Sequence, residues 1–108
     1  MDGRNFANRL NKMSKNVLKP LIPALGLHKR VERVLYLRYI EEQSIYDIAE
    51  DVGMSFDSLN NYLSFARHEM LSTMQRDFEI LPDDIKKLIN IVLSDCKKLV
   101  IQSLKYML

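Results

Sequence analysis

The chain has 108 residues, of which 47% are hydrophobic and 28% are charged. This composition is ordinary for a globular protein and excludes an intrinsically disordered one. The length suits one domain, or one small domain with a helical extension, that buries a core without disulfides or metals. Cys96 is the single cysteine, which fits a reducing, cytoplasmic location. No apolar stretch is long enough to span a bilayer, so no membrane association is expected.

The net charge of +2 conceals a strong segregation along the sequence. Residues 1–38 carry nine basic and two acidic side chains, residues 39–84 carry two basic and eleven acidic ones, and residues 85–108 carry five lysines and one aspartate. The three segments therefore have net charges of +7, −9 and +4. This pattern predicts separate basic and acidic surfaces.

The first expected helix lies near the N-terminus, where apolar side chains recur at helical spacing: Phe6, Leu10, Met13 and Val17. Pro20 and Pro23 each lack an amide proton, so the helix should break there, and Gly26 should end the connector that follows. A second helix should run from about residue 27 to 42 and turn three apolar side chains inward: Val31, Val34 and Leu35.

Two shorter helices are expected next. Ser44 and Asp47 form a capping-box pattern at the start of a helix over about 45–52. Gly53 is the natural residue for a left-handed cap at the end of that helix. Ser55 is a good N-cap for a helix over about 56–70.

The last expected helix covers about residues 82–106. Pro82 suits a first helical turn, where the carboxylates of Asp83 and Asp84 complement the helix dipole. A wide apolar face follows. It either covers the core of the same chain or packs against a second subunit, and the second alternative predicts a homodimer through residues 85–104.

All the expected elements are helices. The sequence therefore predicts an all-α protein, a small bundle of about five helices with a basic N-terminal helix and a long apolar C-terminal helix. Three segments organise this bundle. Residues 1–26 form the basic helix and a Pro-containing connector, residues 27–72 a helix-turn-helix domain, and residues 73–108 a packing or dimerisation helix.

Residues 45–62 carry the pattern of a helix-turn-helix. The steep crossing of its two helices requires a small residue, which Ala49 provides, and the turn requires a residue that tolerates positive φ, which Gly53 provides. The inward positions must be apolar, and all five are: Ile48, Val52, Met54, Leu59 and Tyr62. The alternative interpretation is a pair of amphipathic helices in an ordinary bundle.

Residues 27–71 resemble the fourth conserved region of bacterial primary-type sigma factors. The run Arg33-Val34-Leu35-Tyr36-Leu37-Arg38-Tyr39 is similar to the first helix of that region, and Ile48-Ala49-Glu50 with Gly53-Met54-Ser55 is similar to its turn. The resemblance implies that the helix over 56–70 lies in the major groove and reads promoter bases. Phe65 departs from the family, which often has arginine just before the alanine of this helix.

The outward side of the helix over 56–70 carries the candidate base contacts. Asparagine amides pair with the N6 and N7 atoms of adenine, and serine hydroxyls bond base edges or phosphates. The base-reading candidates are Ser55, Asp57, Ser58, Asn60, Asn61 and Ser64. The phosphate candidates are Arg4, Arg9, Lys12, Lys15, Lys29, Arg30, Arg67 and His68. The alternative for both sets is a solvated helix face, and the basic N-terminal helix has two further alternatives, contact with an anionic membrane surface or with an acidic protein partner.

Two functions fit these features. The first is a transcriptional regulator or sigma-like accessory factor, of cellular, phage or mobile-element type, that binds double-stranded DNA. The second is a non-catalytic module whose acidic surface binds a protein such as RNA polymerase or another regulator. No cofactor or metal is expected, because His28 and His68 lack carboxylates or thiols at ligand spacing. The sequence contains no phosphate-loop or nucleophile motif, so we expect no enzyme.

Overall fold

A computed structural model describes the backbone of residues 3–93 and the side chains of residues 5–93. This part of the chain is all-helical and contains no strand, as the sequence predicts. It consists of α1 (Gly3–Lys12), α2 (Lys15–Ala24), α3 (Lys29–Tyr39), α4 (Ile45–Val52), α5 (Phe56–Arg76), the 3₁₀ turn η1 (Phe78–Ile80) and α6 (Asp83–Val92). None of these helices combines the length and the apolarity needed to cross a bilayer.

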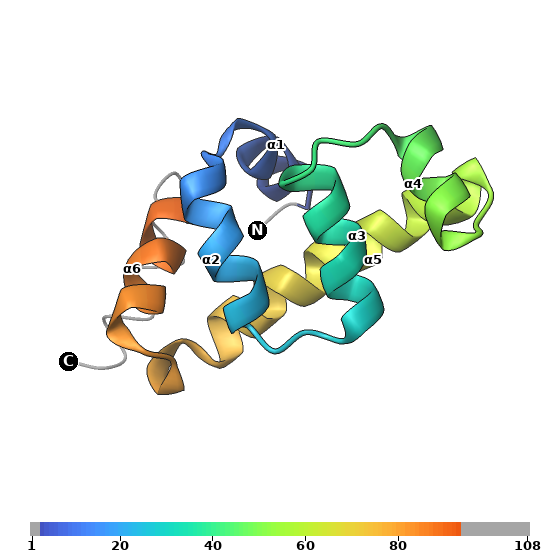
Figure 1. The fold of residues 1–108 in the computed structure, drawn as a ribbon. Helices are drawn as coiled ribbons and strands as arrows, with labels where there is room; N and C mark the ends of the chain where they lie inside the picture. The colour runs from blue at the N-terminus through green and yellow to red at the C-terminus, as the bar shows by residue number, and fades with distance from the viewer. Residues whose placement is uncertain (1–2, 94–108) are drawn as a thin grey trace.

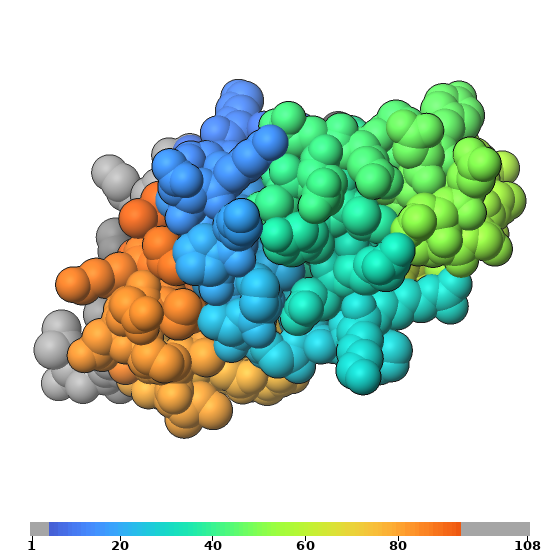
Figure 2. All heavy atoms as spheres, viewed as in Figure 1, coloured from blue at the N-terminus to red at the C-terminus, as the bar shows by residue number. Residues whose placement is uncertain are grey.

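Helix α5 is the longest element and runs through the molecule (Figure 1). Helices α1, α3 and α4 pack against it, and α2 packs between α3 and α6. The molecule is elongated, with extents of 47 × 24 × 22 Å. Helix α4 and the start of α5 form one end of it, and α6 forms the other (Figures 1 and 2).

One hydrophobic cluster receives side chains from all six α-helices. The three side chains of α3 that were predicted to face inward, Val31, Val34 and Leu35, are all buried, which confirms that prediction. The largest side chains with almost no exposed surface are Phe6, Leu10, Leu18, Leu21, Ile22, Leu35, Ile48, Leu59, Leu63, Met70, Met74 and Ile89. Burial of this apolar surface is the main force that holds the helices together.

The predicted helix break at the prolines is wrong, because Pro20 and Pro23 lie inside α2. The break comes earlier, at Ser14, whose hydroxyl accepts a hydrogen bond from the amide of Asn16 at 3.1 Å. Both prolines are exposed, and so are Asn16 and Lys19, whose carbonyls lose their helical partners. Those carbonyls lie on the water-facing side of α2, opposite its buried residues Leu18, Leu21 and Ile22. The single predicted N-terminal helix is therefore two helices.

Two other helices differ from the predicted bounds. The helix expected over about 27–42 is shorter, because His28 caps it and its last residue is Tyr39. The helix expected over about 56–70 continues to Arg76, since its buried side chains continue through Met74. The extra length brings the end of α5 into contact with η1.

The predicted long C-terminal helix falls partly outside the described residues. Helix α6 spans Asp83–Val92, and Pro82 is its N-cap. Its side chains Ile85, Ile89 and Val92 are buried in the core of the same chain. The remainder of the predicted helix, together with Cys96, lies in residues 94–108, so the homodimer through 85–104 stays a prediction.

Candidate nucleic-acid interface

A three-residue connection, Gly53 to Ser55, joins α4 to α5. Gly53 has φ 71° and ψ 36°, the left-handed conformation that was predicted for it, and its amide bonds the carbonyls of Ala49 and Glu50. The hydroxyl of Ser44 accepts from the amide of Asp47 at 3.1 Å and so caps the start of α4. The Ser44 half of the predicted capping box and the Gly53 cap are therefore confirmed.

The hydroxyl of Ser55 accepts a hydrogen bond from the amide of Ser58 at 3.1 Å and caps the start of α5, as predicted. Helix α4 packs directly against α5. Of the five residues predicted to face inward, Ile48 and Leu59 are buried, and so is Ala49, the small residue predicted at the helix crossing. Three others are half-buried rather than buried: Val52, Met54 and Tyr62.

The outward side of α5 carries short polar side chains along its first half. Asp57, Asn61, Ser64 and His68 follow one another at steps of four, three and four, so they form one stripe on the helix, and all four are exposed. Ser58 lies beside this stripe and is also exposed. Asn60 and Arg67 are half-buried on the flank of the helix. This stripe is the part of α5 that a flat or convex partner can reach.

Arg67 is held in place by two hydrogen bonds. Its guanidinium donates to the hydroxyl of Tyr39 on α3 at 3.3 Å and to the hydroxyl of Ser64 at 3.3 Å. The Arg67 charge therefore lies beside the outward stripe. Because a hydroxyl that accepts one bond still has a proton to donate, Ser64 keeps its capacity to bond an acceptor on a partner.

A second basic group reaches α5 from the start of α3. The guanidinium carbon of Arg30 lies 5.6 Å from the centroid of the Tyr62 ring, within the range of a cation–π contact. Lys29, the neighbouring residue, is exposed. His28 caps α3, because its Nδ1 accepts from the Arg30 amide at 3.2 Å. The start of α3 therefore places basic side chains next to the first half of α5.

The basic residues of α1 and α2 take other positions. Arg9 donates to the carbonyls of Val92 and Ile91 at 3.1 and 3.0 Å, so it caps the end of α6. Lys15 pairs with Glu42 at 3.3 Å. Lys12 is exposed, and the side chain of Arg4 lies outside the described residues. Two of the phosphate candidates from these helices, Arg9 and Lys15, are thus engaged with other parts of the chain than α5.

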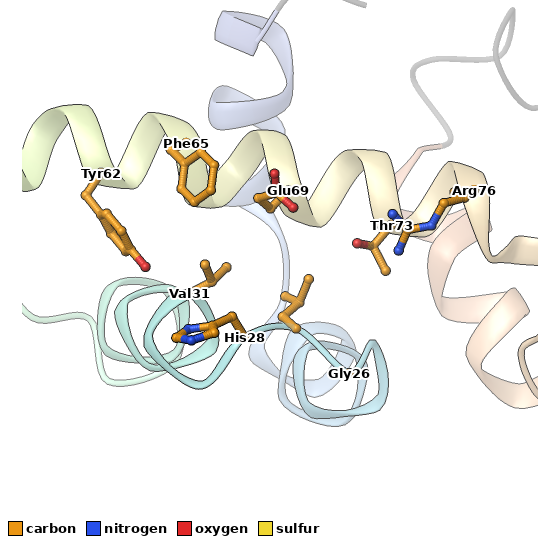
Figure 3. Close-up of a pocket in the computed structure, with 9 residues that line it drawn as sticks. Gly26, His28, Val31, Tyr62, Phe65, Glu69, Thr73 and Arg76 are labelled. Atoms are coloured by element: carbon orange, nitrogen blue, oxygen red, sulfur yellow. The ribbon is translucent and has the colours of Figure 1, made fainter.

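A groove that was not predicted from the sequence runs along α5, with a volume of about 420 Å³. Figure 3 shows its two walls, one formed by α5 and the other by the segment from Gly26 to Val31. Tyr62 and Phe65 line one part of it, and Glu69, Thr73 and Arg76 line the rest. The ring of Phe65 is 49% exposed. Phe65 stands where the resembled family often has arginine, and this departure is the sequence feature that could have indicated the groove.

Arg76, which lines the polar part of the groove, forms an ion pair with the next residue, Asp77. Arg76 donates to both carboxylate oxygens of Asp77, at 2.9 and 3.2 Å. These hydrogen bonds hold the pKa of Asp77 below its ordinary value and raise the pKa of Arg76. Glu69 is the carboxylate that lines the groove, and its charge also raises the pKa of Arg76.

Among residues 5–93, no group of three or more His, Cys, Asp or Glu side chains is arranged to hold a metal ion. Comparison of the chain with protein-family models, with curated proteins and with solved structures found no match. The candidate interface therefore rests on the residues and contacts described above.

Proposed function

We propose that the protein binds duplex DNA and acts as a transcriptional regulator or sigma-like accessory factor. In this proposal α4, the connection from Gly53 to Ser55, and α5 act as a helix-turn-helix, and the first half of α5 enters the major groove. The observation that carries the proposal is the exposed stripe of Asp57, Asn61, Ser64 and His68 at one end of an elongated molecule. The resemblance of residues 27–71 to the sigma-factor region supports the same assignment.

Within this stripe, Asn61 and Ser64 are the principal base-reading residues. The exposed Asn61 amide has both a donor and an acceptor, which match the N7 and N6 edge of adenine. Ser64 lies one turn further along the helix and donates to a base or a phosphate. Ser55 caps the start of α5 and, like Ser64, keeps a hydroxyl proton that it can donate to a partner.

We assign the phosphate contacts to Lys29, Arg30 and Arg67 rather than to α1. Lys29 and Arg30 lie at the start of α3, beside Tyr62 of α5, and Arg67 is fixed beside Ser64. Arg9 and Lys15 are engaged elsewhere. Charges on both flanks of a reading helix set its position on the duplex, while the base contacts provide the sequence preference.

Asn61→Ala tests the proposal, with Asn90→Ala as the matched control. Both asparagines are exposed, but Asn90 lies on α6, at the other end of the molecule. Binding sites are first enriched from a random pool of short duplexes, and affinity for the enriched site is measured by fluorescence anisotropy. Loss of a bidentate base contact costs about 1–3 kcal/mol, so Asn61→Ala should weaken specific binding by about 5- to 150-fold.

Asn90→Ala should leave that affinity unchanged, and both variants should keep the weak, salt-sensitive binding to unrelated duplex. Two results would overturn the proposal. One is a folded protein that enriches no sequence from the pool. The other is an Asn61→Ala variant that binds the enriched site as tightly as Asn90→Ala does.

A further inference from the structure

Two aromatic rings are exposed together at the end of the molecule formed by α4 and the start of α5. Tyr46 of α4 is 70% exposed and Phe56 of α5 is 40% exposed. Their ring centroids are 4.7 Å apart and their planes differ by 28°, so the rings are stacked on each other. A single exposed aromatic side chain is common, but two stacked rings form an apolar patch of the kind that binding sites use.

The chain segment that contains these two rings carries charges of one sign. Residues 39–66 contain six carboxylates and no lysine, arginine or histidine. Two of the six are neutralised by basic residues from other helices, Glu42 by Lys15 at 3.3 Å and Asp51 by Arg33 at 2.6 Å. Asp47 and Glu50 remain exposed on α4. Glu50 lies one helical turn after Tyr46, on the same side of α4.

We infer that Tyr46, Asp47, Glu50 and Phe56, here termed the acidic aromatic face, bind an arginine-containing segment of a protein partner. A guanidinium stacks on an exposed aromatic ring and at the same time donates to a nearby carboxylate. The molecule makes the first of these contacts internally, where Arg30 lies over Tyr62. The exposed rings with adjacent carboxylates offer the same chemistry to an external arginine.

The sign of the charge selects this partner over the alternatives. DNA phosphates and anionic lipid headgroups are repelled by Asp47 and Glu50, whereas a basic peptide is attracted. The inference goes beyond the proposed DNA contact, because it uses the outer side of α4 and the flank of α5 rather than the stripe that contains Asn61. The two activities therefore have separate residues and separate assays.

Peptide binding to the full chain tests the inference. The probes are two fluorescein-labelled peptides of equal length and charge, one of alternating arginine and glycine and one of alternating lysine and glycine. The variants Tyr46→Ala and Glu50→Gln each remove one element of the face. Their matched controls are Ile80→Ala and Glu79→Gln, which alter exposed residues of η1 beyond the other end of α5.

The arginine peptide should bind more tightly than the lysine peptide, because only arginine has a planar group that stacks well on a ring. An exposed cation–π contact is worth about 0.5–1 kcal/mol, so Tyr46→Ala should weaken binding of the arginine peptide roughly two- to fivefold. Glu50→Gln should weaken it as well, and neither control should. Circular dichroism checks that each variant is folded, and Tyr46→Ala should bind DNA as the parent does.

Several outcomes would overturn the inference. Equal affinity for both peptides would show that the protein attracts positive charge without a specific arginine site. Losses of peptide affinity in the η1 controls as large as those in Tyr46→Ala and Glu50→Gln would show the same. A loss of DNA affinity in Tyr46→Ala would assign the rings to DNA. Concentration-dependent self-association that Glu50→Gln abolishes would identify a second copy of this chain as the occupant, through its own basic residues.

Discussion

Gly53 is the residue on which the sharp connection between α4 and α5 depends. Its φ of 71° is strained for any residue with a Cβ, although no atom lies within 4 Å of the position that a Cβ would take. Gly53→Ala should therefore lower the free energy of unfolding by about 1–2 kcal/mol through backbone strain alone. Urea unfolding followed by circular dichroism measures the change. Gly53→Asn should cost less, because asparagine tolerates this conformation; an alanine variant as stable as the parent would contradict the argument.

Single residues were predicted well where the signal is local. The caps at Ser44, Gly53 and Ser55 follow from side-chain and backbone preferences within a few residues, and the structure confirms each of them. His28 was missed as the cap of α3, because histidine is not among the preferred capping residues. The stacking of Tyr46 on Phe56 was also missed, since it depends on how two helices meet rather than on either helix alone.

At the scale of a helix, the two prolines of α2 give a test of what the water-facing side of a helix tolerates. Pro20 is exposed, and it removes the hydrogen bond to a carbonyl that is itself on the exposed side. Pro20→Ala restores that hydrogen bond, and it should raise the free energy of unfolding by about 1–2 kcal/mol after allowance for the greater freedom of the unfolded chain. Thermal unfolding measures this, with Lys19→Ala as an exposed control on the same helix. A less stable alanine variant would mean that the proline ring makes a packing contact.

The helix bounds show where a local pattern is insufficient. The predicted end of α5 at residue 70 was six residues too early, although apolar side chains continue at helical spacing through Leu71 and Met74. Those side chains are buried by packing against other helices, which a single segment does not reveal. The break between α1 and α2 was misplaced for the opposite reason. Proline disfavours the interior of a helix, but the free-energy cost depends on whether the carbonyls that lose their hydrogen bonds can reach water. The sequence does not show that Pro20 and Pro23 are exposed, nor that the helix break lies at Ser14.

At the scale of the whole molecule, Arg9 joins the two ends of the described chain. It is one of the predicted phosphate candidates, yet its guanidinium donates to the last carbonyls of α6, more than eighty residues away. A hydrogen bond to a charged group contributes about 1.5–3 kcal/mol, and one of the two Arg9 bonds is exposed to solvent and adds little, so Arg9→Ala should lower the free energy of unfolding by about 2 kcal/mol. Amide hydrogen exchange at Ile89 to Leu93 should quicken as α6 loosens. Lys12→Ala, on the same helix but exposed, should change neither the stability nor the exchange rates. Unchanged exchange at Ile89 to Leu93 in Arg9→Ala would show that Arg9 does not hold the end of α6 in place.

The distribution of charge over the molecule gives the last prediction, which concerns the salt dependence of DNA binding. The chain is most basic in its first 38 residues, and within that segment Arg30 contacts α5 at Tyr62, with the exposed Lys29 next to it in the sequence. Deleting the N-terminus would be a poor test, because Phe6 and Leu10 are buried and their loss would open the core. Substitutions that remove two positive charges without removing core side chains avoid this.

Each neutralised phosphate contributes about 0.9 to the slope of log K against log salt concentration, so Lys29→Ala with Arg30→Ala should lower the magnitude of that slope by about 2. Lys12→Ala with Lys87→Ala removes the same charge from exposed positions on α1 and α6 and should leave the slope unchanged. Anisotropy titrations between about 50 and 200 mM salt measure both. Equal slopes in the two double variants would mean that the charges act through the overall electric field of the molecule. A smaller slope only in the Lys12→Ala, Lys87→Ala variant would assign the phosphate contacts to α1 and α6.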